Sequence, residues 1–481
     1  MAYLLILFPL LMTVVTFAVP SNRWRPWLLP VGALGHLSLV VRAVFPPEGA
    51  PVISELGGWL LLDALGKVVL GFISVLFFLC SLYAPTYLAL RSERSNRVLC
   101  GNLFASLAMM TLVTLSHHLG LLWVAMEATT LVSASGIYFN HNARSLEATW
   151  KYLLICSVGI ALALLGTFFL AYSAVKSGLE STLLFDQLIK EAPYLSPEWL
   201  HAAFVLLFIG YGTKMGLAPL HTWKPDAYGE APGMVGALLA GGVTNCAFLS
   251  ILRVYQICQA GPEAEFSRQV MIVMGLFSMA VAAVFMVRQR NFKRMLAYSS
   301  VEHMGILILG VGIGGVAMYG ALLHLINNGL TKGVMFLSSG NIHRAYGSRL
   351  IDDVRGAMQR LPISGMLFLA GFLAITGAPP FGPFVSEFTI VSAAIGSGQY
   401  LPAGLFLFFL TVVFMGMGST VLAVIQGEPP ETAAPNDYHD TFGTCAPIVL
   451  FMALVLMMGL YIPPPLEKLL REAAEILEAQ P

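Results

Sequence analysis

The chain has 481 residues, of which 57% are hydrophobic and only 11% charged, and its formal net charge is zero. Soluble domains carry about 25% charged residues, so this composition excludes a large soluble core and indicates a multi-pass membrane protein. The mean hydropathy of +0.78 agrees. The balanced charge gives no sign of a nucleic-acid partner. The six cysteines lack the spacing of zinc or iron–sulfur sites, and no glycine-rich nucleotide-binding loop is evident. We therefore expect no catalytic residue, cofactor or metal on this chain.

The apolar segments predict an all-α fold of about fourteen transmembrane helices, because the runs are too long and continuous for barrel strands. The first has no basic residue before it, unlike a signal peptide, and is interpreted as a retained span. In chain order the expected spans are 2–19, 27–44, 59–88, 98–116, 119–138, 148–175, 200–220, 230–257, 268–287, 293–313, 316–340, 361–391, 400–425 and 444–461. The tail over 465–478 has the spacing of an amphipathic surface helix.

Two of these spans, the seventh and the twelfth, contain glycine and proline near their middles, at 214–219 and 377–383. Proline interrupts a helix, and paired interrupted helices are typical of inverted-repeat transporters. We therefore predict broken helices 7 and 12 within two inverted five-helix repeats. The expected divisions are N-terminal helices 1–3 (1–97), a first repeat (98–257), a second repeat (258–426), and a loop, helix 14 and tail (427–481).

The loops that leave odd-numbered spans hold most of the arginines and lysines, for example Arg91, Arg94 and Arg97. Such loops stay in the cytoplasm. We therefore expect both termini on the outer side of a prokaryotic cytoplasmic membrane.

Several ionisable residues lie within the apolar spans, where each one needs a functional or structural reason. Glu127 lies in span 5, Lys214 beside the break of span 7, and Glu387 just after the break of span 12. Span 10 contains Glu302 and His303. These residue types can change protonation when burial or a neighbouring charge shifts their pKa, which is the property a proton relay requires.

Span 11 adds a polar stripe, because His324, Asn328 and Lys332 are spaced i, i+4, i+8 on one helix face. The stripe indicates either a hydrated pathway or a polar interface between helices. Likewise, Glu127 and Lys214 are either a switchable pair, in which separation lets the lysine release its proton, or a static ion pair. We interpret Glu127, Lys214, His303, His324, Lys332 and Glu387 as proton-transfer residues, and Lys151, His221, Asn245, Asn328 and Glu302 as modulators.

The motifs at 214–232, 293–305 and 381–387 resemble those of the antiporter-like membrane subunits shared by respiratory complex I, Mrp sodium/proton antiporters and membrane-bound nickel–iron hydrogenases. The likeness extends from about residue 60 to 425. Segments 150–160 and 323–332 look most like the F subunit of hydrogenase-4-type complexes. By position, Glu127 and Lys214 match the family's helix-5 glutamate and helix-7 lysine, and Glu387 matches a terminal carrier on helix 12.

The chain departs from the family pattern at three positions. Asn245 stands where many complex I members have a helix-8 lysine. The absence of this lysine puts in doubt a continuous transfer of protons along a hydrated axis at the middle of the membrane. Lys224 and Tyr228 replace an apolar residue and a histidine that are common in the helix-7 motif.

The resemblance implies a membrane subunit that moves H⁺, or Na⁺, in a nickel–iron hydrogenase or complex I-like oxidoreductase. Its partners would be other membrane subunits, lipid and a peripheral redox arm that holds the nickel–iron site and the iron–sulfur clusters. The alternatives are a subunit of an Mrp-type Na⁺/H⁺ antiporter and a non-pumping membrane scaffold.

Overall fold

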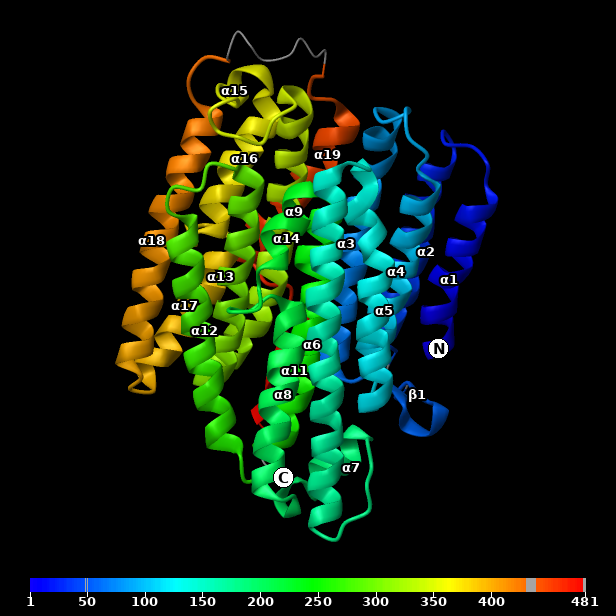
Figure 1. The fold of residues 1–481 in the computed structure, drawn as a ribbon, viewed down its shortest axis with the longest axis vertical. Helices are drawn as coiled ribbons and strands as arrows, with labels where there is room; N and C mark the ends of the chain where they lie inside the picture. The colour runs from blue at the N-terminus through cyan, green and yellow to red at the C-terminus, as the bar shows by residue number, and fades with distance from the viewer. Residues whose placement is uncertain (48, 50, 430–437, 479–481) are drawn as a thin grey trace.

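The computed structural model describes the whole chain except residues 48, 50, 430–437 and 479–481. Long helices run side by side from one end of the molecule to the other (Figure 1). The first group of helices is α1 (Ala2–Ala18), α2 (Leu28–Val44), α3 (Ala64–Ala89), α4 (Arg97–Leu115), α5 (Leu119–Ile137) and α6 (Ala143–Lys176). Helical structure satisfies every backbone hydrogen-bonding group within the segment, which lipid requires.

The second group contains the two interrupted helices and the centre of the molecule. It comprises α8 (Pro197–Met215), α9 (Trp223–Glu230), α10 (Gly233–Leu238), α11 (Thr244–Gln259), α12 (Ala264–Met286), α13 (Phe292–Ile313), α14 (Val316–Tyr346), α16 (Pro362–Ile375), α17 (Gly382–Gly396), α18 (Tyr400–Ile425), α19 (Phe442–Leu460) and α20 (Pro464–Glu478). Short elements fill the connections: α7 (Phe185–Glu191), α15 (Ala357–Arg360), single 3₁₀ turns, and a hairpin of β1 (Ser54–Glu55) with β2 (Leu60–Leu61).

The fold class expected from the sequence is confirmed. Each predicted span coincides with one helix or with one interrupted pair, except the eighth, which consists of α10 and α11 joined by a π-helical segment. Ten helices in the described part of the chain are long and apolar enough to cross a membrane. The other four predicted spans are the short α1, the polar α14, and the interrupted α8–α9 and α16–α17. The division into two repeats stays a prediction, and most of the loop that opens its last division lies outside the described residues.

The break after α8 is made by Gly216, which adopts a left-handed conformation with φ +82°. Its amide donates to the carbonyl of Gly212 (2.8 Å), and the amide of Leu217 returns to the same carbonyl (2.9 Å). These bonds satisfy the carbonyl groups that the end of the helix leaves free. The chain then runs through Pro219 to α9.

The break after α16 repeats this arrangement with Gly377, whose φ is +72°. The amide of Ala378 donates to the carbonyl of Leu373 (3.0 Å), and Pro383 lies in the first turn of α17. The predicted interruptions of helices 7 and 12 are therefore both present, and each ends on a left-handed glycine.

One irregularity was not expected from the sequence. Between α10 and α11 the helix widens into a π-helical segment over Leu239–Val243, which contains Gly241 and Gly242. Segments of this kind are rare and frequently lie at functional sites. This one ends two residues before Asn245 on α11, so the predicted eighth span is continuous but irregular.

The core of the molecule is formed by α11, α13 and α14, which are buried along nearly their whole lengths. The outer helices instead expose large apolar side chains, such as Leu7 on α1, Val284 on α12 and Phe408 on α18. An apolar exterior of this extent suits a lipid environment.

The predicted amphipathic tail is the helix α20, which buries Leu470 and Ala473 against the bundle. The two described ends of the chain lie in the lower half of Figure 1, whereas α15 lies near its top.

Candidate functional site

Lys214 lies in the last turn of α8, next to the break, and has no exposed surface. Its Nζ atom donates hydrogen bonds to Thr130 Oγ1 on α5 (2.8 Å) and to Tyr152 OH on α6 (2.7 Å). The nitrogen also lies 4.6 Å from the centre of the Tyr152 ring. A buried ammonium needs such partners because its desolvation is costly. Lys214 is thus held where α5, α6 and α8 meet.

Glu127 on α5 lies close to this lysine but does not form an ion pair with it. Its Oε2 atom accepts a hydrogen bond from Thr130 (3.3 Å), and its Oε1 atom accepts one from Ser157 on α6 (2.7 Å). The carboxylate and the ammonium of Lys214 are therefore bridged by the Thr130 hydroxyl. The side chain of Glu127 is partly exposed on the outside of the bundle, whereas Lys214 is enclosed.

Lys332 occupies a comparable place in the middle of α14 and also has no exposed surface. Its Nζ atom donates to Ser299 Oγ (2.8 Å) and to the carbonyl oxygen of Leu296 (3.3 Å), both on α13. Glu302, one turn further along α13, interacts electrostatically with Lys332. A second buried lysine is thus held by hydroxyl and carbonyl groups, with a carboxyl group nearby.

A row of three polar side chains continues from α13 to α17. His303 Nδ1 lies 3.0 Å from His324 Nε2, and His324 Nδ1 lies 2.9 Å from Ser386 Oγ. One polar atom each of His303, His324 and Glu387 fall within 4.8 Å of one another. Since each imidazole nitrogen can donate or accept, depending on its protonation, the row can pass a proton between α13 and α17.

The polar stripe predicted on α14 is buried, because His324, Asn328 and Lys332 have no exposed surface. Within the described part of the chain, both side-chain polar atoms of Asn328 lack a protein partner, and the same is true of Asn245 on α11. The Nδ1 atom of His221, between α8 and α9, also has none. Ordered water commonly satisfies buried polar groups of this kind, so these positions suit a hydrated axis.

Sequence reasoning missed the hydroxyl groups that join the charged residues: Thr130, Tyr152, Ser157, Ser299 and Ser386. Helical spacing could have indicated Thr130, which follows Glu127 by three positions, and Ser299, which precedes Glu302 by three. Tyr152 and Ser157 on α6 and Ser386 on α17 lie on other helices than their partners, and only the tertiary structure brings them together.

Lys151 lies apart from the buried polar groups described above. It lines a polar cavity of about 550 Å³ between α6, α9 and the ends of α13 and α14. Its Nζ atom donates to Asp226 (2.8 Å), which also accepts a hydrogen bond from Arg294 (3.0 Å). On the same wall Glu230 pairs with Arg349 (2.6 Å). We call this cavity the polar vestibule. It lies at the end of the molecule opposite the termini.

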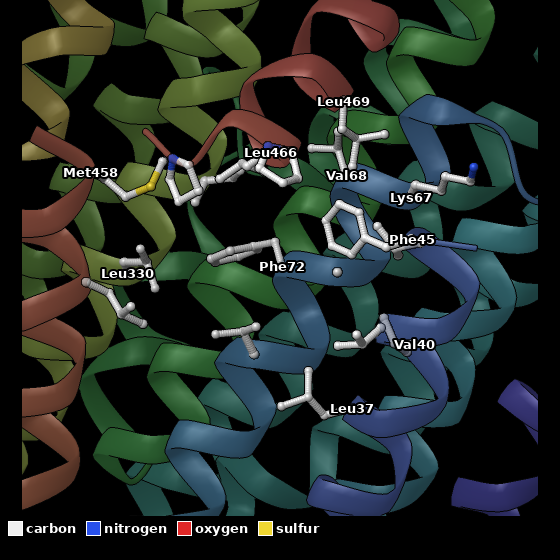
Figure 2. A pocket seen from close by; sticks show the side chains of 18 of the residues that line it. Leu37, Val40, Phe45, Lys67, Val68, Phe72, Leu330, Met458, Leu466 and Leu469 are labelled. Atoms are coloured by element: carbon white, nitrogen blue, oxygen red, sulfur yellow. The ribbon is translucent and has the colours of Figure 1, made fainter. Parts of the chain in front are cut away.

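A second large cavity, of about 540 Å³, lies between α2, α3, α14, α19 and α20 (Figure 2). Phe72, Leu330, Met458 and Leu466 lie around it, and Lys67 lies at its edge (Figure 2). Apart from Lys67 its lining residues are apolar, so it offers no series of groups that could carry ions.

The fold and the site define a multi-pass membrane protein with titratable side chains enclosed across its width, the pattern of proteins that move ions. The chain belongs to the family described as the transmembrane part of NADH:quinone oxidoreductase/Mrp antiporter proteins, whose model matches residues 116–416. It is an antiporter-like membrane subunit, and the resemblance found in the sequence is confirmed.

Among curated relatives, the chain is 34% identical over 476 residues to the hydrogenase-4 component F homolog of Methylacidiphilum infernorum, covering 95% of this chain and 96% of the relative. The fold is similar to a chain of the archaeal membrane-bound sulfane sulfur reductase, with a TM-score of 0.86, 22% identity, and 99% and 97% of the two chains covered. A chain of the Mrp complex from Dietzia sp. DQ12-45-1b gives a TM-score of 0.86 at 21% identity, covering 99% of this chain and 97% of that one.

Proposed function

We propose that this chain translocates protons across a prokaryotic cytoplasmic membrane, as a membrane subunit of a hydrogenase or complex I-like oxidoreductase. The observation that carries the proposal is a series of titratable groups that begins at the partly exposed Glu127 and the buried Lys214 and ends at the buried His303, His324 and Glu387. Placing ionisable side chains within a membrane costs free energy, and proteins retain them where ions move.

The Thr130 bridge suggests how the first step is controlled. While the carboxylate of Glu127 is close, the ammonium of Lys214 is stabilised and keeps its proton. A movement of α5 that withdraws the carboxylate would favour the neutral amine and release the proton toward the centre of the chain. The partly exposed position of Glu127 would let a neighbouring membrane subunit drive this movement.

The driving energy would come from a peripheral redox arm, and we place the nickel–iron site and iron–sulfur clusters on partner subunits. The six cysteines of this chain support that placement, since they are buried on α3, α4, α6, α11 and α19, and Cys246 and Cys258, which share α11, are twelve positions apart. The one cluster of three metal-ligating side chains found in the described part of the chain contains no cysteine. An iron–sulfur cluster, which needs thiolate ligands, therefore has no suitable site among these residues.

The polar vestibule would be the cytoplasmic entrance, and the termini would then lie on the outer side. This orientation agrees with the positive-inside rule, since Arg294 and Arg349 line the vestibule. The carboxylate of Asp226, held by Lys151, would exchange protons with bulk water at this end.

A direct test is the Lys214→Ala variant in the purified complex, reconstituted into proteoliposomes. We expect redox turnover to continue while proton uptake, followed with a ΔpH-sensitive dye, falls to background. The exposed Lys468 on α20 provides the matched control, because Lys468→Ala removes a lysine outside the row. Unchanged proton movement in Lys214→Ala would overturn the role given to this residue.

The second candidate function is that of a cation/proton antiporter subunit, which the likeness to a chain of the Mrp complex favours. Such a subunit would exchange ions in response to a gradient alone. Copurification separates the two candidates, because a nickel–iron subunit in the purified complex supports the first and a set of small membrane subunits without redox centres supports the second. Redox activity in a complex that moves no charge would instead support the scaffold that Asn245 suggests.

A further inference from the structure

Lys224 on α9 is a third buried lysine, and the functional site described so far does not use it. Its side chain has no exposed surface, and its Nζ atom has no hydrogen-bond partner among the residues that the structure describes. Lys214 and Lys332 each donate two hydrogen bonds, by contrast. Burying an ammonium without partners is costly, so a lysine kept in this state requires a reason.

The position of Lys224 lies between the two lysines already assigned. Tyr152, which binds Lys214, packs against Trp223 with ring centres 5.0 Å apart. The Lys224 nitrogen lies 5.9 Å from the centre of the Trp223 ring. On this side, then, two aromatic rings separate the ammonium groups of Lys214 and Lys224.

Contacts on the other side lead toward Lys332. The Lys224 nitrogen lies 5.8 Å from the Tyr228 ring, which packs against Phe336 on α14. Phe336 follows Lys332 by one helical turn, and the charges of Lys224 and Lys332 interact electrostatically. Lys224 therefore lies between Lys214 and Lys332, the two buried lysines already assigned to proton transfer.

The helix break makes the space that Lys224 occupies. A side chain at Gly216 would collide with the Lys224 stem, and its Cβ would lie 2.8 Å from the lysine nitrogen. The second break has the same design, since a side chain at Gly377 would collide with the carboxylate of Glu387. In both breaks a left-handed glycine thus faces an ionisable side chain, and Glu387 is already assigned as a carrier.

We propose that Lys224 is the central proton carrier of this chain and supplies the titratable group that Asn245 on α11 does not provide. This inference rests on the proposed function. The neutral amine of Lys224 accepts one proton from the Lys214 side and becomes an ammonium. It then gives one proton to the neutral amine of Lys332, so each transfer moves a single proton and changes no other bond.

The test uses the assembled complex in proteoliposomes and compares redox turnover with proton uptake. Lys224→Leu removes the titratable group and places at this position the apolar residue that related motifs contain, which favours folding. We expect proton uptake per electron to fall by at least about tenfold, since a positioned acid–base group contributes roughly 10²–10⁴-fold to proton transfer. Lys468→Leu on the exposed face of α20 is the matched control, and it should pump as the unmodified chain does.

Two further variants separate a carrier from a structural cation. Lys224→Arg keeps the positive charge but cannot release its proton, so we expect it to assemble and to lose proton uptake like the leucine variant. Adding Asn245→Lys to Lys224→Leu returns a titratable group to the middle of the row and should restore at least half of the uptake. Normal uptake by both Lys224→Leu and Lys224→Arg would overturn the inference.

Lys214→Ala distinguishes this failure from failure of the proposed function. If Lys214→Ala abolishes proton uptake and the Lys224 variants do not, then only the central carrier is wrong. If the unmodified complex moves no protons, the proposed function itself fails.

Discussion

Glu127 and Lys214 are joined through one hydroxyl group, since Lys214 donates to Thr130 (2.8 Å) and Thr130 donates to Glu127 (3.3 Å). A direct ion pair would hold both charges firmly, whereas a hydroxyl bridge lets the carboxylate move away while the lysine keeps a partner. The bridging hydroxyl therefore suits a pair whose interaction has to change each time a proton is transferred.

Thr130→Val removes this bridge with little change in volume. We expect proton uptake by the reconstituted complex to fall about tenfold, because a hydrogen bond to a charged group contributes about 1.5–3 kcal/mol. The control is Thr411→Val on α18, whose hydroxyl donates to the carbonyl of Leu407 in its own helix. Equal uptake by the two valine variants would show that the bridge has no part in transfer.

His324→Leu interrupts the row between His303 and Ser386. We expect the complex to assemble and turn over its redox substrates, with proton uptake reduced to near background, because leucine cannot accept or donate a proton. His201→Leu is a suitable control, since His201 is partly exposed and pairs with Glu263 outside the row. If pumping survives in His324→Leu, protons leave by a route that avoids α14.

Gly216→Ala places a methyl group against the Lys224 side chain and also strains a backbone with φ +82°. Gly178→Ala separates these effects, because Gly178 has φ +76° but nothing lies within 4 Å of an added Cβ. Both variants should lose about 1–3 kcal/mol of stability from backbone strain. Only Gly216→Ala should impair proton uptake, as measured in proteoliposomes, and equal impairment by Gly178→Ala would contradict this account.

Asp63 at the start of α3 pairs with Arg253 on α11, whose two terminal guanidinium nitrogens each donate to one carboxylate oxygen. Burial tends to raise the pKa of Asp63, but the charge and hydrogen bonds of Arg253 outweigh it and hold the pKa below its usual value. A lowered pKa in the folded state means that the pair stabilises the fold fully above the unfolded pKa, near 3.9. The stabilisation is lost as the pH falls through the lower, folded value.

Asp63→Asn should therefore cost about 3–5 kcal/mol at neutral pH, because it leaves the buried Arg253 without its counter-charge. The free energy of unfolding of the detergent-solubilised chain, measured at pH 7 and at progressively lower pH, gives this loss. The difference in that free energy between Asp63→Asn and the unmodified chain should become smaller as the pH falls. Glu467→Gln, which breaks the exposed pair with Arg471, should change stability by less than about 1 kcal/mol. Similar effects of the two changes would show that burial does not strengthen the Asp63 pair.

The sequence by itself determined the class of fold and the charged members of the site. Apolar runs of the length of a bilayer can only be helices, and glycine and proline inside two of them require interruptions. Charges such as Lys214 and Lys332 stand out in apolar segments because their burial is expensive. These inferences depend on local composition and on the spacing of residues, both of which can be read directly from the sequence.

Only the tertiary structure decided how these groups are connected. The hydroxyls of Tyr152 and Ser157 meet Lys214 and Glu127 because α6 packs against α5 and α8, and no spacing along the chain encodes that meeting. In the sequence Lys224 is one departure from a family motif. The tertiary structure places it against Gly216 and between two other buried lysines. Hydrogen bonds and electrostatic coupling act over a few ångströms, and distances of that size between separate helices are set by packing.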